Sequence, residues 1–268
     1  MKIGILGNIA KVKSVDAINE FVGYLSSLGY QTQLFTSHMD VNNVDVVIVL
    51  GGDGAILHSA VIAAQRGIKV IGINYGNLGF LTEYEKDERK EIKELLTQLK
   101  DNACRILKRS ILQVEIVGKT YYALNEIALH RECGFSSTKQ AQLLRVQVNS
   151  REGKDVISGD GVLICTPTGS TAYSLSAGGA ILTPEVPVFM LTPVCAFSMR
   201  TRPIVFSDEE EVALKIKRGN ATISVDGLTV VSLPEEATVF IKKAPFTADF
   251  PVRENSDFFT KVRNKLNE

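Results

Sequence analysis

One carboxylate stands among three glycines in the segment Gly51-Gly52-Asp53-Gly54, directly after the apolar run 44–50. That run is rich in β-branched residues, which is typical of a strand buried on both faces, and helical spacing follows the glycines. In an open α/β sheet, ligands bind beyond the carboxyl ends of strands, where a glycine turn lets backbone N–H groups approach phosphate. Asp53 could there take a proton from an alcohol that attacks phosphorus, or help to position Mg²⁺. The plainer interpretation, equally open at this point, is that Asp53 only caps the following helix.

Further polar segments interrupt the apolar runs. Residues 74–81 follow the next strand on the same edge of the sheet, so this glycine-containing loop could fold over a ligand. The pair Asn125-Glu126 interrupts the strand-like run 121–130, and buried polar groups need partners such as the hydroxyls of a ribose. Gly159-Asp160-Gly161 and the hydroxyl-rich run 165–179 offer donors and acceptors for a nucleoside pocket. Ordinary connections and a solvated loop are the simpler interpretations of these segments.

The elements that must position these groups change in character along the chain. In the first hundred residues, strand-like runs alternate with helix-period stretches, which predicts a mostly parallel sheet covered by helices. Residues 102–245 instead carry short alternating runs rich in Val, Ile, Thr and Tyr, and Asp226-Gly227 predicts a tight hairpin turn. The fold class expected is therefore an α/β N-terminal domain with a mostly parallel sheet, at residues 1–101, and an all-β C-terminal domain at 102–245.

Composition excludes several classes of protein. The 268 residues carry 30 Lys and Arg against 30 Asp and Glu, so the chain lacks the positive field that would hold a nucleic acid. The longest apolar stretches, 44–50 and 56–64, fall short of the ~20 residues of a membrane span, and the N-terminus has no signal-peptide core. We therefore expect a cytosolic protein. The cysteines and histidines are too scattered for zinc-ligand spacing, so no metal held by protein side chains alone is expected.

Taken together, these segments resemble the NAD kinases in identity, order and approximate spacing. The glycine turn alone is a weak signal, since lipid kinases and phosphofructokinases share it, whereas the long hydroxyl-rich run is highly specific. With the two-domain layout, the resemblance covers nearly the whole chain. The matching segments are Gly51-Gly52-Asp53-Gly54, Asn77-Leu78-Gly79-Phe80-Leu81, Asn125-Glu126 and Thr166-Pro167-Thr168-Gly169-Ser170-Thr171-Ala172-Tyr173-Ser174-Leu175-Ser176-Ala177-Gly178-Gly179.

The resemblance implies transfer of a phosphoryl group from ATP or polyphosphate to the 2′-hydroxyl of the adenosine ribose of NAD, giving NADP. It implies that Asp53 is the base for this hydroxyl, and that the three glycines beside it leave room for phosphates. The implied roles of the remaining residues divide among the parts of the ligands. Gly51, Gly52 and Gly54 would meet phosphate, Gly54 also NAD; Asn125 and Glu126 would hold adenosine; Asp160, Ala172 and Tyr173 would contact the nicotinamide half; Thr168, Thr171 and Ser176 would complete the pocket; Phe80 with Leu57 would wall the adenine side.

The resemblance also implies a divalent metal, Mg²⁺, carried by the donor nucleotide, and a homo-oligomer, a tetramer or a dimer. Family members return the C-terminal tail to the first domain, which agrees with the mixed, partly helical pattern of 246–268. Ala55 departs from the family pattern, because a Thr commonly follows Gly-Gly-Asp-Gly. Cys165 replaces a frequent Ser and Ala180 a frequent Pro. The missing hydroxyl at position 55 bears on binding of the donor rather than of NAD.

Two alternatives remain open on the sequence. A lipid or sugar kinase of the same superfamily would need an apolar groove or an arginine-lined sugar-phosphate pocket, and the run 166–176 fits neither well. A non-catalytic sensor that binds NAD or NADP without turnover would not need Asp53. The two are distinguished from an NAD kinase by the product formed from NAD and ATP.

Overall fold

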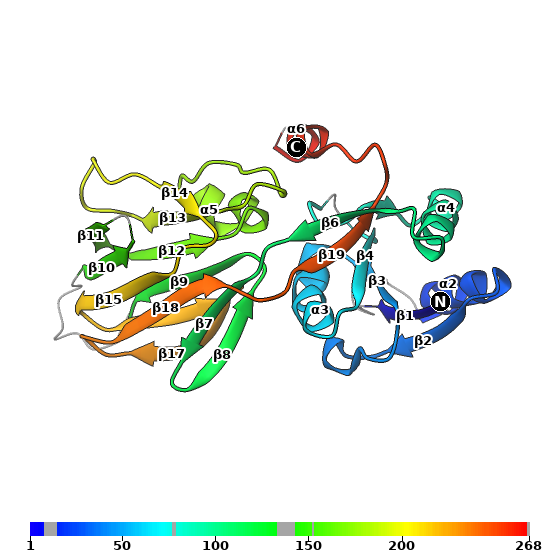
Figure 1. The fold of residues 1–268 in the computed structure, drawn as a ribbon, viewed down its shortest axis with the longest axis horizontal. Helices are drawn as coiled ribbons and strands as arrows, with labels where there is room; N and C mark the ends of the chain where they lie inside the picture. Colours follow the sequence, from blue (N-terminus) through cyan, green and yellow to red (C-terminus); the bar gives the residue numbers. More distant parts are fainter. Residues whose placement is uncertain (8–14, 77–78, 133–142, 152, 267–268) are drawn as a thin grey trace. The chain divides into compact units, whose positions relative to one another are not determined.

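A computed structural model describes residues 1–7, 15–76, 79–132, 143–151 and 153–266. The chain divides into two compact units, the first made of Met1–Arg109 with Phe246–Glu268 and the second of Ser110–Pro245 (Figure 1). Asn77 and Leu78, which belong to the predicted ligand loop, lie outside the described residues.

The first unit is built on a parallel sheet of five strands in the order β2-β1-β3-β4-β5. The central strand β3 is buried over its whole length, as its β-branched sequence predicts. The predicted α/β fold class is therefore confirmed for this part of the chain. The strands are β1 (Lys2–Gly7), β2 (Gln31–Phe35), β3 (Val46–Gly51), β4 (Lys69–Asn74) and β5 (Tyr84–Glu85); the helices are α2 (Val15–Ser27), α3 (Asp53–Gln65) and α4 (Arg89–Lys100), with a short 3₁₀ turn η1 (His38–Asp40).

The two polar segments of the first unit begin at one edge of this sheet. Gly51, the last residue of β3, pairs in register with Asn74, the last residue of β4. The glycine turn leads into α3 and the loop after Asn74 leads toward β5, so both start from neighbouring carboxyl ends. This is the arrangement that the alternation of strands and helices predicts.

The C-terminal segment belongs to the first unit. Strand β19 (Ala248–Val252) pairs antiparallel with β6 (Arg105–Arg109), and helix α6 (Phe258–Leu266) follows it (Figure 1). The sequence places the boundary at 101/102, whereas β6 belongs with the first unit because its ladder partner is β19. A pairing between segments so far apart in the chain leaves no local signal in either strand.

The second unit is an all-β sandwich, as predicted. Two antiparallel sheets of six strands, ordered β11-β10-β15-β18-β7-β8 and β14-β13-β12-β9-β16-β17, share one apolar core. Two short helical turns, η2 (Thr168–Thr171) and α5 (Tyr173–Ser176), interrupt the strands. The strands are β7 (Leu112–Ile116), β8 (Lys119–Ala123), β9 (Glu126–Arg131), β10 (Leu144–Ser150), β11 (Gly153–Gly159), β12 (Gly161–Cys165), β13 (Val188–Val194), β14 (Ile204–Ser207), β15 (Val212–Arg218), β16 (Ala221–Val225), β17 (Leu228–Leu233) and β18 (Thr238–Lys243).

The strand predicted at 121–130 is two strands. It divides between β8, in one sheet, and β9, in the other, and the break falls at Leu124 and Asn125. The expected hairpin turn is present, since Asp226 (φ 48°) and Gly227 (φ 76°) adopt the left-handed conformation between β16 and β17.

Candidate active site

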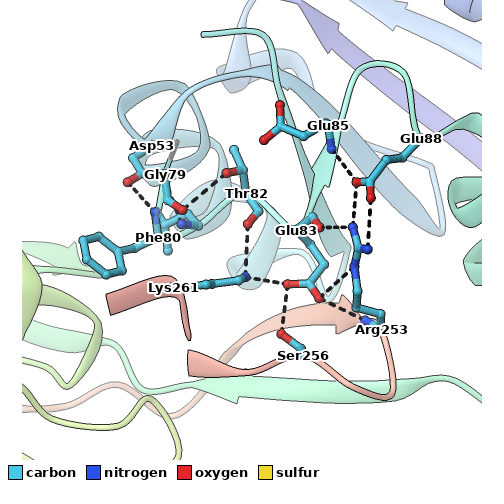
Figure 2. Close-up of polar contacts among 11 residues, drawn as sticks. Asp53, Gly79, Phe80, Thr82, Glu83, Glu85, Glu88, Arg253, Ser256 and Lys261 are labelled. Atoms are coloured by element: carbon cyan, nitrogen blue, oxygen red, sulfur yellow. Dashed lines mark hydrogen bonds and ion pairs between the residues drawn. The ribbon is translucent and has the colours of Figure 1, made fainter. Parts of the chain in front are cut away.

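The Asp53 carboxylate lies at the start of α3 and binds the loop that follows β4. Its Oδ2 accepts a hydrogen bond from the Phe80 N–H at 2.8 Å and its Oδ1 accepts one from the Leu81 N–H at 2.9 Å (Figure 2). The N-cap position of α3 is Gly52, and no side chain caps the helix there. The interpretation of Asp53 as a mere helix cap is therefore wrong. Its carboxylate retains lone pairs on both oxygens for a proton or a substrate hydroxyl.

Gly79 makes this arrangement possible. A Cβ at position 79 would lie 2.2 Å from Oδ1 and 2.8 Å from Cγ of Asp53, so any larger residue would displace the carboxylate. Asn74, buried at the end of β4, shapes the beginning of the same loop by donating to the Gly76 carbonyl at 3.1 Å and accepting from its N–H. Asp53 is thus held by loop backbone, which fixes its orientation without another charged side chain.

The glycine turn presents a helix N-terminus beside Asp53. Gly51 is buried, Gly52 is half-buried and Gly54 is exposed with open space where a Cβ would lie. Exposed first-turn N–H groups and the helix dipole together favour an anion such as phosphate. Of the two residues expected to wall the adenine side, both half-buried, Leu57 lies one turn into α3 and Phe80 lies with its ring 6.4 Å from that of Phe258.

In the second unit, Asn125 and Glu126 stand at the point where the chain passes from β8 to β9. The Asp226 carboxylate fixes this break, accepting from the N–H groups of Leu124 at 2.9 Å, Asn125 at 2.8 Å and Glu126 at 3.2 Å. Sequence reasoning assigned Asp226 only to a hairpin turn. Its second role leaves no sequence signal, because the bonds join residues about a hundred positions apart.

The hydroxyl-rich run packs against the same break. Thr166 donates its N–H to the Asn125 carbonyl at 2.9 Å and its hydroxyl to the Leu124 carbonyl at 2.5 Å. A Cβ on Gly169 would lie 2.1 Å from the Asn125 carbonyl oxygen, so glycine is required there. These contacts place the start of the hydroxyl-rich run beside Leu124 and Asn125; that the run and the pair Asn125-Glu126 line a ligand pocket stays a prediction.

Glu126 is the buried titratable group of this wall. Its side chain is enclosed, and Oε2 has no hydrogen-bond partner among the described residues. Burial, reinforced by the charge of Asp226, raises the pKa of Glu126 to about 7, and burial raises the pKa of Asp226 to about 6. Three backbone N–H donors favour the ionised form of Asp226, and they partly offset the rise of its pKa that burial causes. A buried carboxyl oxygen without a partner is a natural contact for a ligand hydroxyl or amide.

The remaining predicted residues of the second unit lie between β11 and β12 and in or beside the short helices η2 and α5. Tyr173 stacks on His130, with ring centroids 5.5 Å apart, and Asp160 forms an ion pair with Arg131 at 2.9 Å. His130 and Arg131 were not identified from the sequence, although both end β9, the strand that begins at Glu126. Of the other predicted residues, Thr168 is buried, Thr171 and Ala172 are half-buried and Ser176 is exposed.

Several hydroxyls of the run are used by the fold itself. Ser174 shares a hydrogen bond of 2.8 Å with Thr192 across the sheet, and Ser170 donates to the Pro167 carbonyl at 2.6 Å. These two side chains are buried, so they stabilise the wall rather than present donors to a ligand. The predicted site residues thus form two sets, one in each unit. In each set, hydrogen bonds join segments that are distant in the sequence.

No group of three or more His, Cys, Asp or Glu residues that could hold a metal ion occurs in the described part of the chain. Across those same residues, no helix combines the length and the apolar character that crossing a membrane requires.

Comparison with known proteins identifies the family. The model of the ATP-NAD kinase N-terminal domain matches residues 5–117, and that of the ATP-NAD kinase C-terminal domain matches residues 124–251. The chain belongs to the NAD kinase family. It is 31% identical to an NAD kinase of Methanothermobacter thermautotrophicus over 100% of this chain and 97% of that protein, and 33% identical to one of Fusobacterium nucleatum over 99% and 97%.

Solved structures of related kinases share the fold. The yeast NADH kinase complexed with NADH superposes with a TM-score of 0.85 at 24% identity, covering 100% of this chain and 87% of that one. An NAD kinase from Archaeoglobus fulgidus in complex with ATP gives a TM-score of 0.79 at 25% identity, covering 100% and 98%. This NAD kinase family member therefore has both domains of the family, each with its predicted set of polar residues.

Proposed function

We propose that this chain is an ATP-dependent NAD kinase that phosphorylates the 2′-hydroxyl of the adenosine ribose of NAD, giving NADP and ADP. Its relatives, matched over nearly their whole length, are named NAD kinases, and the kinase from Archaeoglobus fulgidus was solved with ATP. The observation that carries the proposal is the Asp53 carboxylate, held by two backbone N–H groups beside a helix N-terminus. A protein that merely bound the dinucleotide would not need such a group.

Asp53 acts in this proposal as the general base. Its carboxylate takes the proton of the 2′-hydroxyl as that oxygen attacks the γ-phosphorus of ATP, and the bond from this phosphorus to the β–γ bridging oxygen breaks, releasing ADP. The N–H groups of Phe80 and Leu81 each bind one carboxylate oxygen and so fix the orientation of the carboxylate. Positioning of this kind supplies much of the rate in phosphoryl transfer, where little covalent chemistry is asked of the protein.

The proposed phosphate contacts lie in the first unit, and most of the proposed NAD contacts lie in the second. Gly51, Gly52 and Gly54 bind phosphate at the start of α3, where the helix dipole favours negative charge. The second-unit set recognises NAD, and the unpartnered Oε2 of Glu126 supports a contact with a ligand donor. In full, Asn125 and Glu126 hold adenosine, Asp160, Ala172 and Tyr173 contact the nicotinamide half, Thr168, Thr171 and Ser176 complete the pocket, and Leu57 with Phe80 covers the adenine.

A divalent cation, Mg²⁺, enters with the donor in this proposal. Mg²⁺ is commonly bound by one or two carboxylates together with substrate phosphates, and the lone Asp53 carboxylate beside the phosphate-binding turn fits that pattern. The described residues offer no larger cluster of ligands. When bound, the ion neutralises charge on the donor phosphates, while the proton transfer remains with Asp53.

We also propose that the chain forms a homo-oligomer, a tetramer or a dimer. The segment between β13 and β14 exposes Phe197 (78%) and Met199 (87%), and edge strand β14 adds the exposed Ile204 and Val205. Exposed apolar side chains of this size commonly mark protein interfaces. Light scattering of the purified protein should give a mass of two or four chains, and a monomer at assay concentration would refute this part of the proposal.

The activity is tested by incubating the purified chain with NAD, ATP and Mg²⁺ and measuring NADP with an NADP-specific dehydrogenase. We expect equal amounts of NADP and ADP, and a loss of both in the variant Asp53→Asn. A parallel reaction with polyphosphate in place of ATP reports the donor. NAD binding by calorimetry with neither NADP nor ADP formed from either donor would identify a sensor and overturn the proposal.

A further inference from the structure

The tail of the chain is anchored to the loop that holds Asp53. Arg253, Ser256 and Lys261, which follow β19 and lead into α6, all contact Glu83 (Figure 2). The partners lie 170 to 178 residues apart in the sequence, so no local motif could indicate these contacts. Both segments belong to the first unit.

Glu83 is the buried acceptor at the centre of this contact. Its side chain is only 6% exposed, and Oε2 accepts from Lys261 Nζ at 2.6 Å and from the Ser256 hydroxyl at 3.1 Å. Oε1 accepts from the Arg253 N–H at 3.2 Å. A buried carboxylate is tolerated only when paired and hydrogen-bonded, so the tail and the loop must order together.

Lys261 also reaches past Glu83 to the turn itself. Its Nζ donates to the Thr82 carbonyl at 3.1 Å, one residue after Leu81, whose N–H binds Asp53. Phe258, one helical turn before Lys261, places its ring 6.4 Å from that of Phe80. On its other side the loop is held to β4, because the Glu83 N–H donates to the Gly72 carbonyl at 3.0 Å. Lys261 therefore fixes the exit of the turn whose N–H groups orient the carboxylate.

Arg253 has a different place in the network. Its guanidinium forms an ion pair with Glu88 at 2.7 Å, lies 4.4 Å from the centre of the Tyr84 ring and donates to the Glu83 carbonyl at 2.6 Å. These partners lie on the side of the loop that leads to α4, beyond the residues that touch Asp53. Arg253 shares Glu83 with Lys261, since its Nε lies 3.6 Å from Oε1, but its other partners lie in β5 and at the start of α4. Of the two side chains, Lys261 is the one that reaches Thr82, next to the residues that hold the carboxylate.

We propose that Lys261 is a positioning residue for Asp53, setting through Thr82 and Glu83 the position of the two N–H groups that hold the carboxylate. The inference rests on the proposed role of Asp53. A misplaced Asp53 carboxylate lowers kcat, whereas KM for NAD should change little because the proposed NAD contacts of the second unit are untouched and Phe80 is the one proposed NAD contact in this loop. Lys261 itself touches neither substrate in this proposal.

The test compares Lys261→Met, which keeps the length of the side chain without its charge, with Lys261→Arg, which keeps the charge. We expect Lys261→Met to lower kcat by about 10-fold with KM for NAD changed less than about twofold, and Lys261→Arg to recover most of kcat. Amide hydrogen exchange of residues 80–82 should accelerate in Lys261→Met alone. The matched control is Lys90→Met on α4, where the lysine side chain is 84% exposed and its Nζ lies 4.0 Å from Glu94; this variant should change neither kcat nor exchange at 80–82.

Wild-type kcat and wild-type exchange at 80–82 in Lys261→Met would overturn the inference, as would equal loss of kcat in the Met and Arg variants. Should Lys261→Met not fold, Lys261→Gln serves, because it removes the ammonium that pairs with Glu83 while keeping a polar side chain and leaving the Arg253 and Ser256 contacts in place; we then expect a fall in kcat, and unchanged kcat overturns the inference. Asp53→Asn is measured in the same assay. If that variant keeps wild-type turnover, the role of Asp53 fails; if it loses turnover while Lys261→Met does not, only the positioning role fails.

Discussion

Gly79 lies so close to Asp53 that a Cβ at position 79 would meet Oδ1 of the carboxylate at 2.2 Å. The glycine of the loop and the aspartate of the turn therefore form one unit, although they are separated by a helix and a strand. The contact shows why the two motifs occur together, and it leads to the first prediction.

Gly79→Ala should lower turnover by about 10- to 100-fold, because the added methyl pushes the Asp53 carboxylate from its position. The cost in the free energy of unfolding should be about 1 kcal/mol, since a flexible side chain can move away at the expense of its hydrogen bonds. Steady-state kinetics and urea unfolding check both values. Gly23→Ala is the control, because that glycine lies in α2 with open space at its Cβ, and it should leave turnover unchanged. Unchanged turnover in Gly79→Ala would show that the observed carboxylate position is not needed.

Asp53→Asn should have two effects. Turnover should fall by about 10²- to 10⁴-fold through loss of the base. The free energy of unfolding should also fall by about 1–3 kcal/mol, because an amide nitrogen cannot accept the second of the two N–H groups that bind the carboxylate. Affinity for NAD, measured by calorimetry, should change little. A variant with normal stability would show that the bonds to Phe80 and Leu81 contribute nothing to the loop.

Gly169→Ala should affect the second unit more severely than Gly79→Ala affects the first. The added Cβ would lie 2.1 Å from the oxygen and 2.5 Å from the carbonyl carbon of Asn125, and backbone cannot rotate away as a side chain can. We expect a loss of about 1–3 kcal/mol in the free energy of unfolding, together with weaker binding of NAD. Thermal melting and calorimetry measure the two quantities. Normal NAD affinity in this variant would show that the chain break at Asn125 is not part of the NAD-binding site.

The pH dependence of stability should depend on Glu126. Because the pKa of this carboxyl is raised from 4.5 to about 7 in the folded protein, the unfolded chain loses the proton first as pH rises. The stabilising effect is complete below about pH 4.5 and is lost progressively up to about pH 7. Asp226, with its pKa raised from 3.8 to about 6, adds a loss in the same direction at lower pH.

Glu126→Gln should therefore make the free energy of unfolding less dependent on pH between about 4.5 and 7, removing a change of about 2–3 kcal/mol. Urea unfolding at a series of pH values measures this. Glu115→Gln, on the exposed face of β7, is the control and should keep the dependence of the parent protein. Identical pH profiles for Glu126→Gln and the parent would mean that Glu126 is not buried as the structure has it.

Much of the first unit follows from the sequence, because its strands and helices carry patterns of two different periods. Strand β3 is buried over its whole length and leads directly into helix α3, as the β-branched run 44–50 and the helical spacing after the glycines predict. That Asp53 is the reactive carboxylate stays a prediction, which its place after a buried strand allowed and the resemblance to the NAD kinases implied. Its hydrogen bonds to Phe80 and Leu81 were not, since a glycine loop has no periodicity from which contacts can be inferred.

In the second unit the sequence indicated short strands but not their pairing. The run 121–130 has continuous strand character, yet the chain changes sheets at Leu124 and Asn125 because the Asp226 carboxylate binds the N–H groups there. Nothing in the local sequence around Asp226 or around the pair Asn125-Glu126 indicates that the two segments are in contact. Only the ladder between β9 and β16 brings them together.

The sequence by itself determined the two fold classes and the family, and it supplied the candidate site residues, because local periodicity and contiguous motifs depend on neighbouring residues. The tertiary structure alone decided how those residues are held: Asp53 by the loop after β4, Asn125 by Asp226, and the Asp53 loop by Lys261 of the tail. Each of these contacts joins segments distant in the chain. Such contacts form only when packing has brought both partners together, so no local sequence pattern could predict them.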